Sequence, residues 1–238
     1  MIGEEIKRIT AELPDGVRLV AVSKFHPEET VMEAYGAGQR IFGESHVQEL
    51  QRKHETLPSD IEWHFIGHLQ TNKVKYIAPY VALIHAVDTP KLLAEIDKQG
   101  VKCGRRIPCL LQLHVAQEET KFGFTPEEAE ELLREGAWRE MQGVEIRGVM
   151  CMASLTDDEE QIAQEFDRAR QFFQMARERY FADQPSFAEC SWGMSDDYPI
   201  ALQHGSTMVR IGSLIFGPRE YKGKASYNII IKSNAYTG

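Results

Sequence analysis

The chain alternates between short apolar runs and longer segments with helical periodicity. The apolar runs are rich in Val, Ile, Leu and Phe, and several are apolar throughout, as expected for strands that are covered on both faces. Eight such runs recur at fairly even spacing, and they predict strands at residues 18–25, 40–43, 62–67, 82–87, 107–115, 146–152, 187–192 and 208–216.

Segments with helical periodicity fill the intervals between these strands. Helices are predicted at 27–36, 69–76 and 127–134, and an extra helix at 2–13 precedes the first strand. The longest helical segment, 157–180, carries a stripe of apolar residues at helical spacing, formed by Ile162, Phe166, Ala169 and Phe173.

Three helix starts carry capping signals. Thr89 and Thr125 each precede a proline, which is favoured at the first helical position. Ser45, with Gln48 three residues later, has the spacing of a capping box. These signals predict where the corresponding helices begin.

The alternation of strand and helix predicts the fold class. Eight repeats in this order indicate parallel strands joined by right-handed crossovers. We therefore predict an α/β fold, a (β/α)8 TIM barrel with an extra N-terminal helix, and a doubly wound open sheet is the alternative. The chain has no Pro/Ser-rich linker and no low-complexity tract, so residues 1–238 are predicted to form a single domain.

Composition and charge narrow the possible partners. Of the 238 residues, 42% are hydrophobic and 26% are charged, as in ordinary globular proteins. The formal net charge of −9 argues against nucleic-acid binding, which needs a basic surface. No apolar run approaches the length of a membrane span, and the first ten residues lack the apolar centre of a signal peptide. A cytoplasmic location without membrane contact is predicted.

Cysteine and histidine spacing gives no indication of a metal site. The four cysteines form no CxxC pair, and three of them lie in apolar runs, where cysteine acts as a small hydrophobic residue (Cys109, Cys151 and Cys190). His64 and His68 are four residues apart, but Gly67 and the apolar run place them on a strand and the loop after it. We expect His64 at the rim or in a polar layer of the barrel.

Lys24 is the first candidate for chemistry. It lies near the end of an apolar run, where alternation directs its side chain into the barrel mouth. Because burying an ammonium group is costly, a lysine at such a position is unusual. It is either a desolvated Schiff-base nucleophile or a lysine that reaches back to the surface, and the pattern alone leaves both open.

A second cluster of polar residues lies near the C-terminus. Segment 193–197 follows the seventh strand, 205–207 precedes the eighth, and 210–213 contains Arg210. Barrels often bind phosphate at the loops after strands seven and eight, although Gly, Ser and Asp also build ordinary turns. Strand eight neighbours strand one in a closed barrel, so a ligand with an aldehyde and a phosphate would suit both Lys24 and this cluster.

At these residues the sequence resembles the pyridoxal phosphate homeostasis proteins, whose barrel is similar to the N-terminal domain of alanine racemases. The resemblance runs from about residue 19 to residue 221. The motifs that carry it are AVSK (21–24), FGE (42–44), VQE (47–49), WHFIG (63–67), LQTNK (69–73), GMSDD (193–197) and GSTMVRIG (205–212). Each motif is weak alone, but together and in this order they are specific.

The resemblance implies pyridoxal 5′-phosphate as the cofactor, held as a Schiff base on Lys24. Arg210 matches the arginine that faces the pyridine nitrogen. The implied phosphate contacts are Met194, Ser195, Thr207 and Gly212, of which Thr207 is the least secure. The family usually reads Glu-Asn-Tyr where this chain has Glu44-Ser45-His46, so no cofactor contact is carried over to Ser45.

The resemblance also implies a role in intracellular homeostasis of the cofactor, with little or no catalytic activity. Arginine is only a hydrogen-bond donor, so it does not supply the proton that strengthens the cofactor as an electron sink. Racemases add a second domain with a tyrosine base, whereas this chain ends when the barrel is complete, and a monomer is expected. Apo-enzymes that need the cofactor are candidate partners. The alternatives are a racemase or lyase, a Schiff-base aldolase, or a barrel with another phosphate ligand.

Overall fold

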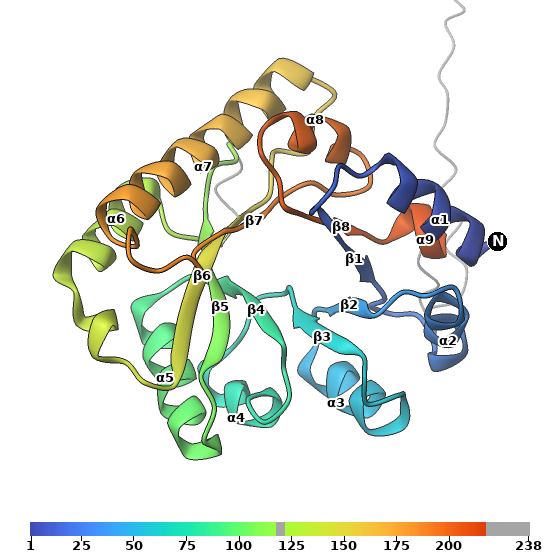
Figure 1. Ribbon diagram of the computed structural model, residues 1–238, viewed down its shortest axis with the longest axis horizontal. Coiled ribbons are helices and arrows are strands. Elements are labelled where there is room, and N and C mark those ends of the chain that lie inside the picture. Colours follow the sequence, from blue (N-terminus) through green and yellow to red (C-terminus); the bar gives the residue numbers. More distant parts are fainter. Residues whose placement is uncertain (118–121, 218–238) are drawn as a thin grey trace, which may run out of the picture.

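A computed structural model describes residues 1–117 and 122–217, and within them eight parallel strands close into a barrel in chain order (Figure 1). This confirms the TIM barrel and excludes the doubly wound alternative. The strands are β1 (Arg18–Val22), β2 (Ile41–Glu44), β3 (Glu62–Phe65), β4 (Leu83–Val87), β5 (Ile107–Leu113), β6 (Val144–Cys151), β7 (Glu189–Ser191) and β8 (Met208–Ile211).

Helices surround the barrel, and the extra N-terminal helix lies beside the last one (Figure 1). The helices are α1 (Ile2–Glu12), α2 (Glu28–Gly36), α3 (Val47–Thr56), α4 (Val74–Ile77), α5 (Pro90–Cys103), α6 (Pro126–Glu135), α7 (Glu159–Arg179), α8 (Tyr198–Gln203) and α9 (Ser213–Phe216). Two short 3-10 turns, η1 (Thr71–Lys73) and η2 (Ala137–Glu140), complete the described elements. None of the described helices is both long and apolar enough to cross a membrane.

Two of the three predicted caps are confirmed. The Thr89 hydroxyl accepts a hydrogen bond from the Leu92 amide at 3.2 Å, and Thr125 forms a complete capping box with Glu128. The prediction for Ser45 is wrong, because α3 begins one residue later with His46 at its N-cap and no side-chain cap. Ser45 instead lines a cavity at the barrel mouth.

Most predicted strands run past their observed C-terminal ends, the first and the last by three residues or more and the others by one or two. The first ends at Val22 rather than at residue 25, so Lys24 lies in a turn. The last divides into β8 and the short helix α9, with Gly212 between them. Both errors have one cause: apolar residues resume after the turn, Phe25 in the first case and residues 214–216 in the second, so the pattern extends the strand past its end.

Strand alternation sorts the buried residues into two sets. Outward-facing strand residues pack against the helices, and a smaller apolar cluster within the barrel includes Val20, Leu110 and Met208. Cys109, Cys151 and Cys190 are buried, which confirms their interpretation as small hydrophobic residues, and Cys103 is exposed.

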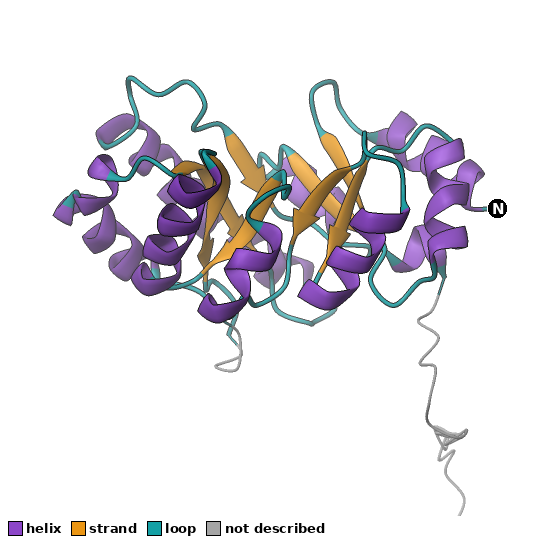
Figure 2. Ribbon diagram, turned by 90° about the horizontal axis from the view of Figure 1, so that it is seen from below, coloured by secondary structure: helices purple, strands orange, loops and turns teal. Residues whose placement is uncertain are grey.

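The barrel brings its first and last strands together. β8 pairs with β1, with Val20 opposite Arg210 and Ala21 opposite Ile211. All strands run in the same direction, so their C-terminal ends lie at one end of the barrel (Figure 2). Functional groups of such barrels lie at this end, and the loops after β1, β7 and β8 meet there.

Candidate cofactor-binding site

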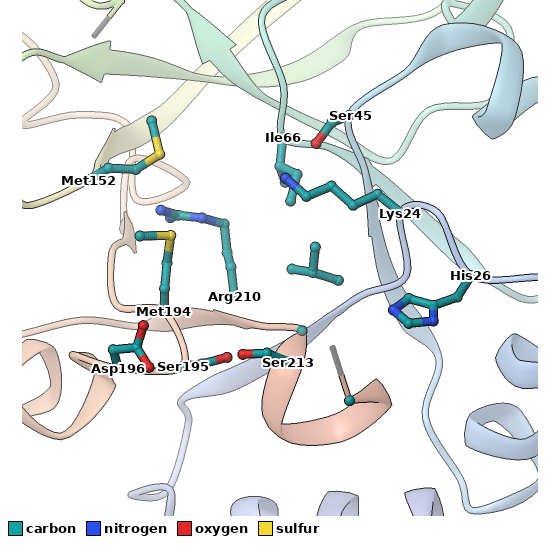
Figure 3. A pocket seen from close by; sticks show the side chains of 13 residues that line it. Lys24, His26, Ser45, Ile66, Met152, Met194, Ser195, Asp196, Arg210 and Ser213 are labelled. Atoms are coloured by element: carbon teal, nitrogen blue, oxygen red, sulfur yellow. The ribbon is translucent and has the colours of Figure 1, made fainter. Parts of the chain in front are cut away.

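A cavity of about 240 Å³ lies where the loops after β1, β7 and β8 converge (Figure 3). Ser45, Ile66 and Met152, from three other loops, complete its wall. Of the six predicted site residues, five line this cavity: Lys24, Met194, Ser195, Arg210 and Gly212. Residues that are distant in the sequence are therefore brought to one site.

Lys24 enters the cavity from a tight turn after β1. The His26 amide donates to the Ser23 carbonyl at 3.1 Å, and Phe25 has a φ of 68°, which is left-handed and uncommon for a residue other than glycine. The Lys24 side chain extends across the cavity towards Ile66 (Figure 3). Of the two alternatives that the sequence leaves open, the structure therefore favours a lysine that points into the site.

Hydroxyl groups gather at the opposite end of the cavity. Ser195, after β7, and Ser213, after β8, direct their oxygens towards each other (Figure 3). Gly212 lies between β8 and Ser213, and a Cβ atom there would come within 3.2 Å of the Val22 carbonyl oxygen. The glycine thus lets this loop pass close to the end of β1, and the two serines offer donors for an anion.

Met194 contributes differently from the prediction. Its backbone amide donates to Asp197 Oδ1 at 2.6 Å, so this amide is engaged within its own turn, and the side chain lines the cavity. Burial raises the pKa of the Asp197 carboxyl above its ordinary value, while the bond from the Met194 amide lowers it. The predicted phosphate contact from the Met194 backbone does not fit this geometry.

The structure does not bring Thr207 to the cavity. Thr207 immediately precedes β8, at the end of that strand opposite to Gly212. Its hydroxyl accepts from the Cys190 amide at 2.8 Å and lies beside Glu189, near the base of the barrel. Its place before the strand was the signal that should have excluded it, because ligands bind at the C-terminal ends of barrel strands.

Arg210 is buried on β8, with 4% of its surface exposed, and neutral groups hold it. Nη1 donates to the carbonyl and the hydroxyl of Ser191 at 2.7 and 2.6 Å, and Nη2 donates to the Cys151 carbonyl at 3.0 Å. Burial lowers its pKa, although a guanidinium stays charged in proteins. No carboxylate of the described residues forms an ion pair with Arg210, so its charge is available to a ligand.

Two buried histidines continue this polar chain inside the barrel. His64 Nδ1 and His85 Nε2 lie 2.9 Å apart, and His85 Nδ1 lies 2.9 Å from Ser191 Oγ. Desolvation lowers the pKa of His64 to about 3 and that of His85 well below its ordinary value, so both rings are neutral. His64 thus lies in a polar layer, as expected, whereas the sequence analysis missed His85 and Ser191.

His68 belongs to a separate pair. It is hydrogen-bonded to Asp88 at 2.8 Å and stacks on Phe122, away from His64. Within residues 1–117 and 122–217, no three histidine, cysteine or acidic side chains are grouped so as to hold a metal.

These groups fit the cofactor that the sequence suggests. An amine enters from one side, two hydroxyls lie at the other, and a buried guanidinium lies along a third side, next to Met152 and Met194 (Figure 3). A small ring that bears an aldehyde and a phosphate matches this arrangement of groups.

Comparisons with known proteins agree with this geometry. The profile of the alanine racemase N-terminal domain family matches residues 2–220. A pyridoxal phosphate homeostasis protein of Aquifex aeolicus is 38% identical over 205 residues, which are 86% of this chain and 88% of that protein. The structure of PipY from Synechococcus elongatus with pyridoxal phosphate bound is 34% identical, with a TM-score of 0.81, over 91% of this chain and 100% of PipY. Alanine racemase from Bartonella henselae, at 15% identity and a TM-score of 0.68 over 92% of this chain and 58% of the racemase, shows the fold alone.

Proposed function

The chain belongs to the alanine racemase N-terminal domain family and, within it, to the pyridoxal phosphate homeostasis proteins, and from this we propose that it binds pyridoxal 5′-phosphate at Lys24. The observation that carries the proposal is the convergence of Lys24, Ser195 and Arg210 on one cavity. Pyridoxal phosphate bound to PipY supports the same ligand here.

Each residue has a distinct role in this proposal. The cofactor would supply an aldehyde carbon, which is a target for an unprotonated lysine amine. Lys24 is the anchor that provides this amine. Ser195 and Ser213 would donate hydrogen bonds to its phosphate, and Gly212 would allow the close approach of that group. Arg210 would face its ring nitrogen.

We further propose that the protein stores and buffers the cofactor rather than using it for catalysis. Arg210 is only a donor, so it holds no proton on the ring nitrogen and leaves the cofactor a weak electron sink. A bound aldehyde is also kept from reacting with other amines. Transfer to apo-enzymes, action as a monomer and a cytoplasmic location stay predictions from the sequence.

The test compares the wild type with Lys24→Ala after pyridoxal phosphate is added and then borohydride. We expect a yellow absorbance band in the wild type, reduction of the linkage onto Lys24, and neither in Lys24→Ala. Lys75→Ala, which removes an exposed lysine of α4, is the matched control and should behave as the wild type. A band that survives in Lys24→Ala, or none in the wild type, would overturn the proposal. Turnover of amino acids by the loaded protein would overturn the non-catalytic part alone.

A further inference from the structure

A buried cluster of charged residues lies beneath the turn that carries Lys24. It consists of Glu44 at the end of β2 and of Glu49 and Lys53 on α3, and we name it the lysine–carboxylate cluster. Lys53 Nζ donates to Glu44 Oε1 at 2.7 Å and to Glu49 Oε1 at 2.8 Å. The side chains of Lys53 and Glu44 have no exposed surface, and that of Glu49 is 12% exposed.

The cluster binds both neighbours of Lys24. On the N-terminal side, Lys53 Nζ donates to the Ser23 carbonyl at 2.7 Å, and the Ser23 hydroxyl donates to Glu44 Oε1 at 2.6 Å. On the C-terminal side, the Phe25 amide donates to Glu49 Oε1 at 2.8 Å. The residues on either side of Lys24 are therefore tied to one cluster: Lys53 and Glu49 hold the backbone, and Glu44 holds the Ser23 side chain.

The turn needs such support because of its backbone conformation. The φ of 68° at Phe25 lies in the left-handed region, where a Cβ atom crowds the following carbonyl. Conformations of this kind persist only where surrounding contacts hold them. The bond from the Phe25 amide to Glu49 is one such contact, and it acts at the strained residue itself.

Burial of three ionisable groups is also costly in itself. Desolvation of charged side chains commonly outweighs their mutual attraction, so a well-packed apolar cluster would stabilise this part of the barrel equally well. Desolvation raises the pKa of Glu44 to about 7 although Lys53 and the Ser23 hydroxyl act to lower it, so the burial of this carboxyl is not fully compensated. An arrangement this expensive, placed directly under the anchor lysine, indicates a role beyond packing.

We propose that Glu44, Glu49 and Lys53 are positioning residues, which hold the 23–25 turn so that the Lys24 amine points into the cavity. The inference rests on the proposed function, since it assigns the cluster to the linkage formed at Lys24. None of the three lines the cavity, so they act through the backbone of the turn.

The test removes one contact and then relieves the strain that this contact opposes. Glu49→Leu removes the acceptor of the Phe25 amide, whereas Glu49→Gln keeps a carbonyl oxygen in its place. Phe25→Asn, combined with Glu49→Leu, replaces the strained residue with one that tolerates a left-handed φ. Asp97→Leu is the matched control, because Asp97 is also a helix carboxylate that accepts from a loop amide, that of Gly143 at 2.6 Å.

Three measurements on each full-length protein decide the outcome. The rate at which the absorbance band forms with added pyridoxal phosphate reports the placement of Lys24. Hydrogen exchange of the Phe25 amide in the cofactor-free protein reports the turn itself, and thermal unfolding reports the general cost of each substitution.

We expect Glu49→Leu to slow the linkage by about tenfold or more, since small misplacements of a reacting group have effects of this size. The Phe25 amide should exchange faster in Glu49→Leu, Glu49→Gln should stay near the wild type, and Phe25→Asn should recover most of the lost rate. A wild-type rate in Glu49→Leu would overturn the inference, as would equal slowing in Asp97→Leu. A wild type that forms no linkage overturns the proposed function instead, and exchange at Phe25 then still shows whether the cluster holds the turn.

Discussion

Two cations are buried beside the cavity, and their surroundings differ in one respect. Lys53 donates to two carboxylates and one carbonyl, so its charge is compensated where it lies. Arg210 donates to two carbonyls and one hydroxyl, and the carboxylate that most affects its pKa, Asp197, acts from a distance. The protein neutralises one cation internally and leaves the other for an external partner.

This difference distinguishes a buried charge that stabilises the fold from a buried charge that attracts a ligand. A compensated cation such as Lys53 has no attraction left for a ligand, and it organises the backbone around it. An uncompensated cation such as Arg210 costs more to bury, and that cost is recovered only when an electron-rich group approaches. The two regions should therefore respond differently to substitution: the Lys53 region chiefly in stability and in the rate of linkage at Lys24, and the Arg210 region in the absorbance of the bound cofactor.

The largest effect on stability is expected from Lys53→Met. This substitution leaves Glu44 and Glu49 buried without their cation, and breaking a buried ion pair in this way costs about 3–5 kcal/mol of the free energy of unfolding. Urea unfolding at constant pH measures the loss. Lys75→Met on the exposed face of α4 should stay within about 0.5 kcal/mol of the wild type. A loss below about 1 kcal/mol for Lys53→Met would show that Lys53 does not hold the carboxylates.

A smaller, pH-dependent effect on the free energy of unfolding is expected from Glu44. Its pKa is raised from 4.5 to about 7 in the folded protein, chiefly by desolvation, so the folded state binds this proton more tightly than the unfolded state does. The resulting stability is fully present below pH 4.5 and is lost as pH rises through 7, amounting to about 3 kcal/mol at most. Glu44→Gln should remove this dependence.

The comparison of Glu44→Gln with the wild type also separates the pH dependence of stability due to Glu44 from that due to His64 and His85. The lowered pKa values of His64 and His85 give the opposite slope, because unfolding lets both rings take up protons below about pH 6.5. This slope is common to both proteins, so it cancels in the difference between their unfolding free energies from pH 5 to pH 8. An unchanged difference across that range would contradict the assignment to Glu44.

The smallest effect on stability is expected from Ser191→Ala. The substitution removes the hydroxyl that accepts from Arg210 and pairs with His85, which costs about 1–2 kcal/mol. The looser Arg210 should shift the absorbance band of the bound cofactor without slowing the linkage at Lys24. Ser206→Ala is the control, since this buried serine donates to the Trp192 carbonyl at 2.6 Å instead. If Ser191→Ala slowed the linkage at Lys24 and left the absorbance band unshifted, the roles given to the Arg210 region and the Lys53 region would be reversed.

The barrel was predictable because its strands are covered on both faces. Each strand is a short apolar run, and each interval carries a helical pattern, so their order is visible without tertiary information. The ends of the strands were not predictable. Phe25 and residues 214–216 are apolar although the backbone has already turned, and the bond from the Phe25 amide to Glu49, which helps to hold the first of these turns, joins residues that are distant in sequence.

The candidate site was predictable where its residues follow strands. Lys24, Ser195 and Gly212 come after β1, β7 and β8, and strand order alone brings these loops together. Lys53 was missed because a lysine within a helix is ordinarily exposed, even though it falls on the buried stripe of α3 with Val47 and Leu50. His85 was missed for a different reason. Its partner Ser191 lies on another strand, so no local sequence pattern shows the pair.

The pairing of β8 with β1 also fixes when the site can exist. The ribosome releases Lys24 early in synthesis and the strand with Arg210 near its end, at roughly 5–20 residues per second. Until β8 inserts beside β1, the nascent chain carries the anchor lysine and Ser195, but Arg210 and Ser213 have not yet reached the cavity. We therefore expect the cofactor to bind only after β8 has been made, because a chain that stops before residue 208 lacks Arg210 and the β8 loop that complete the cavity around Lys24.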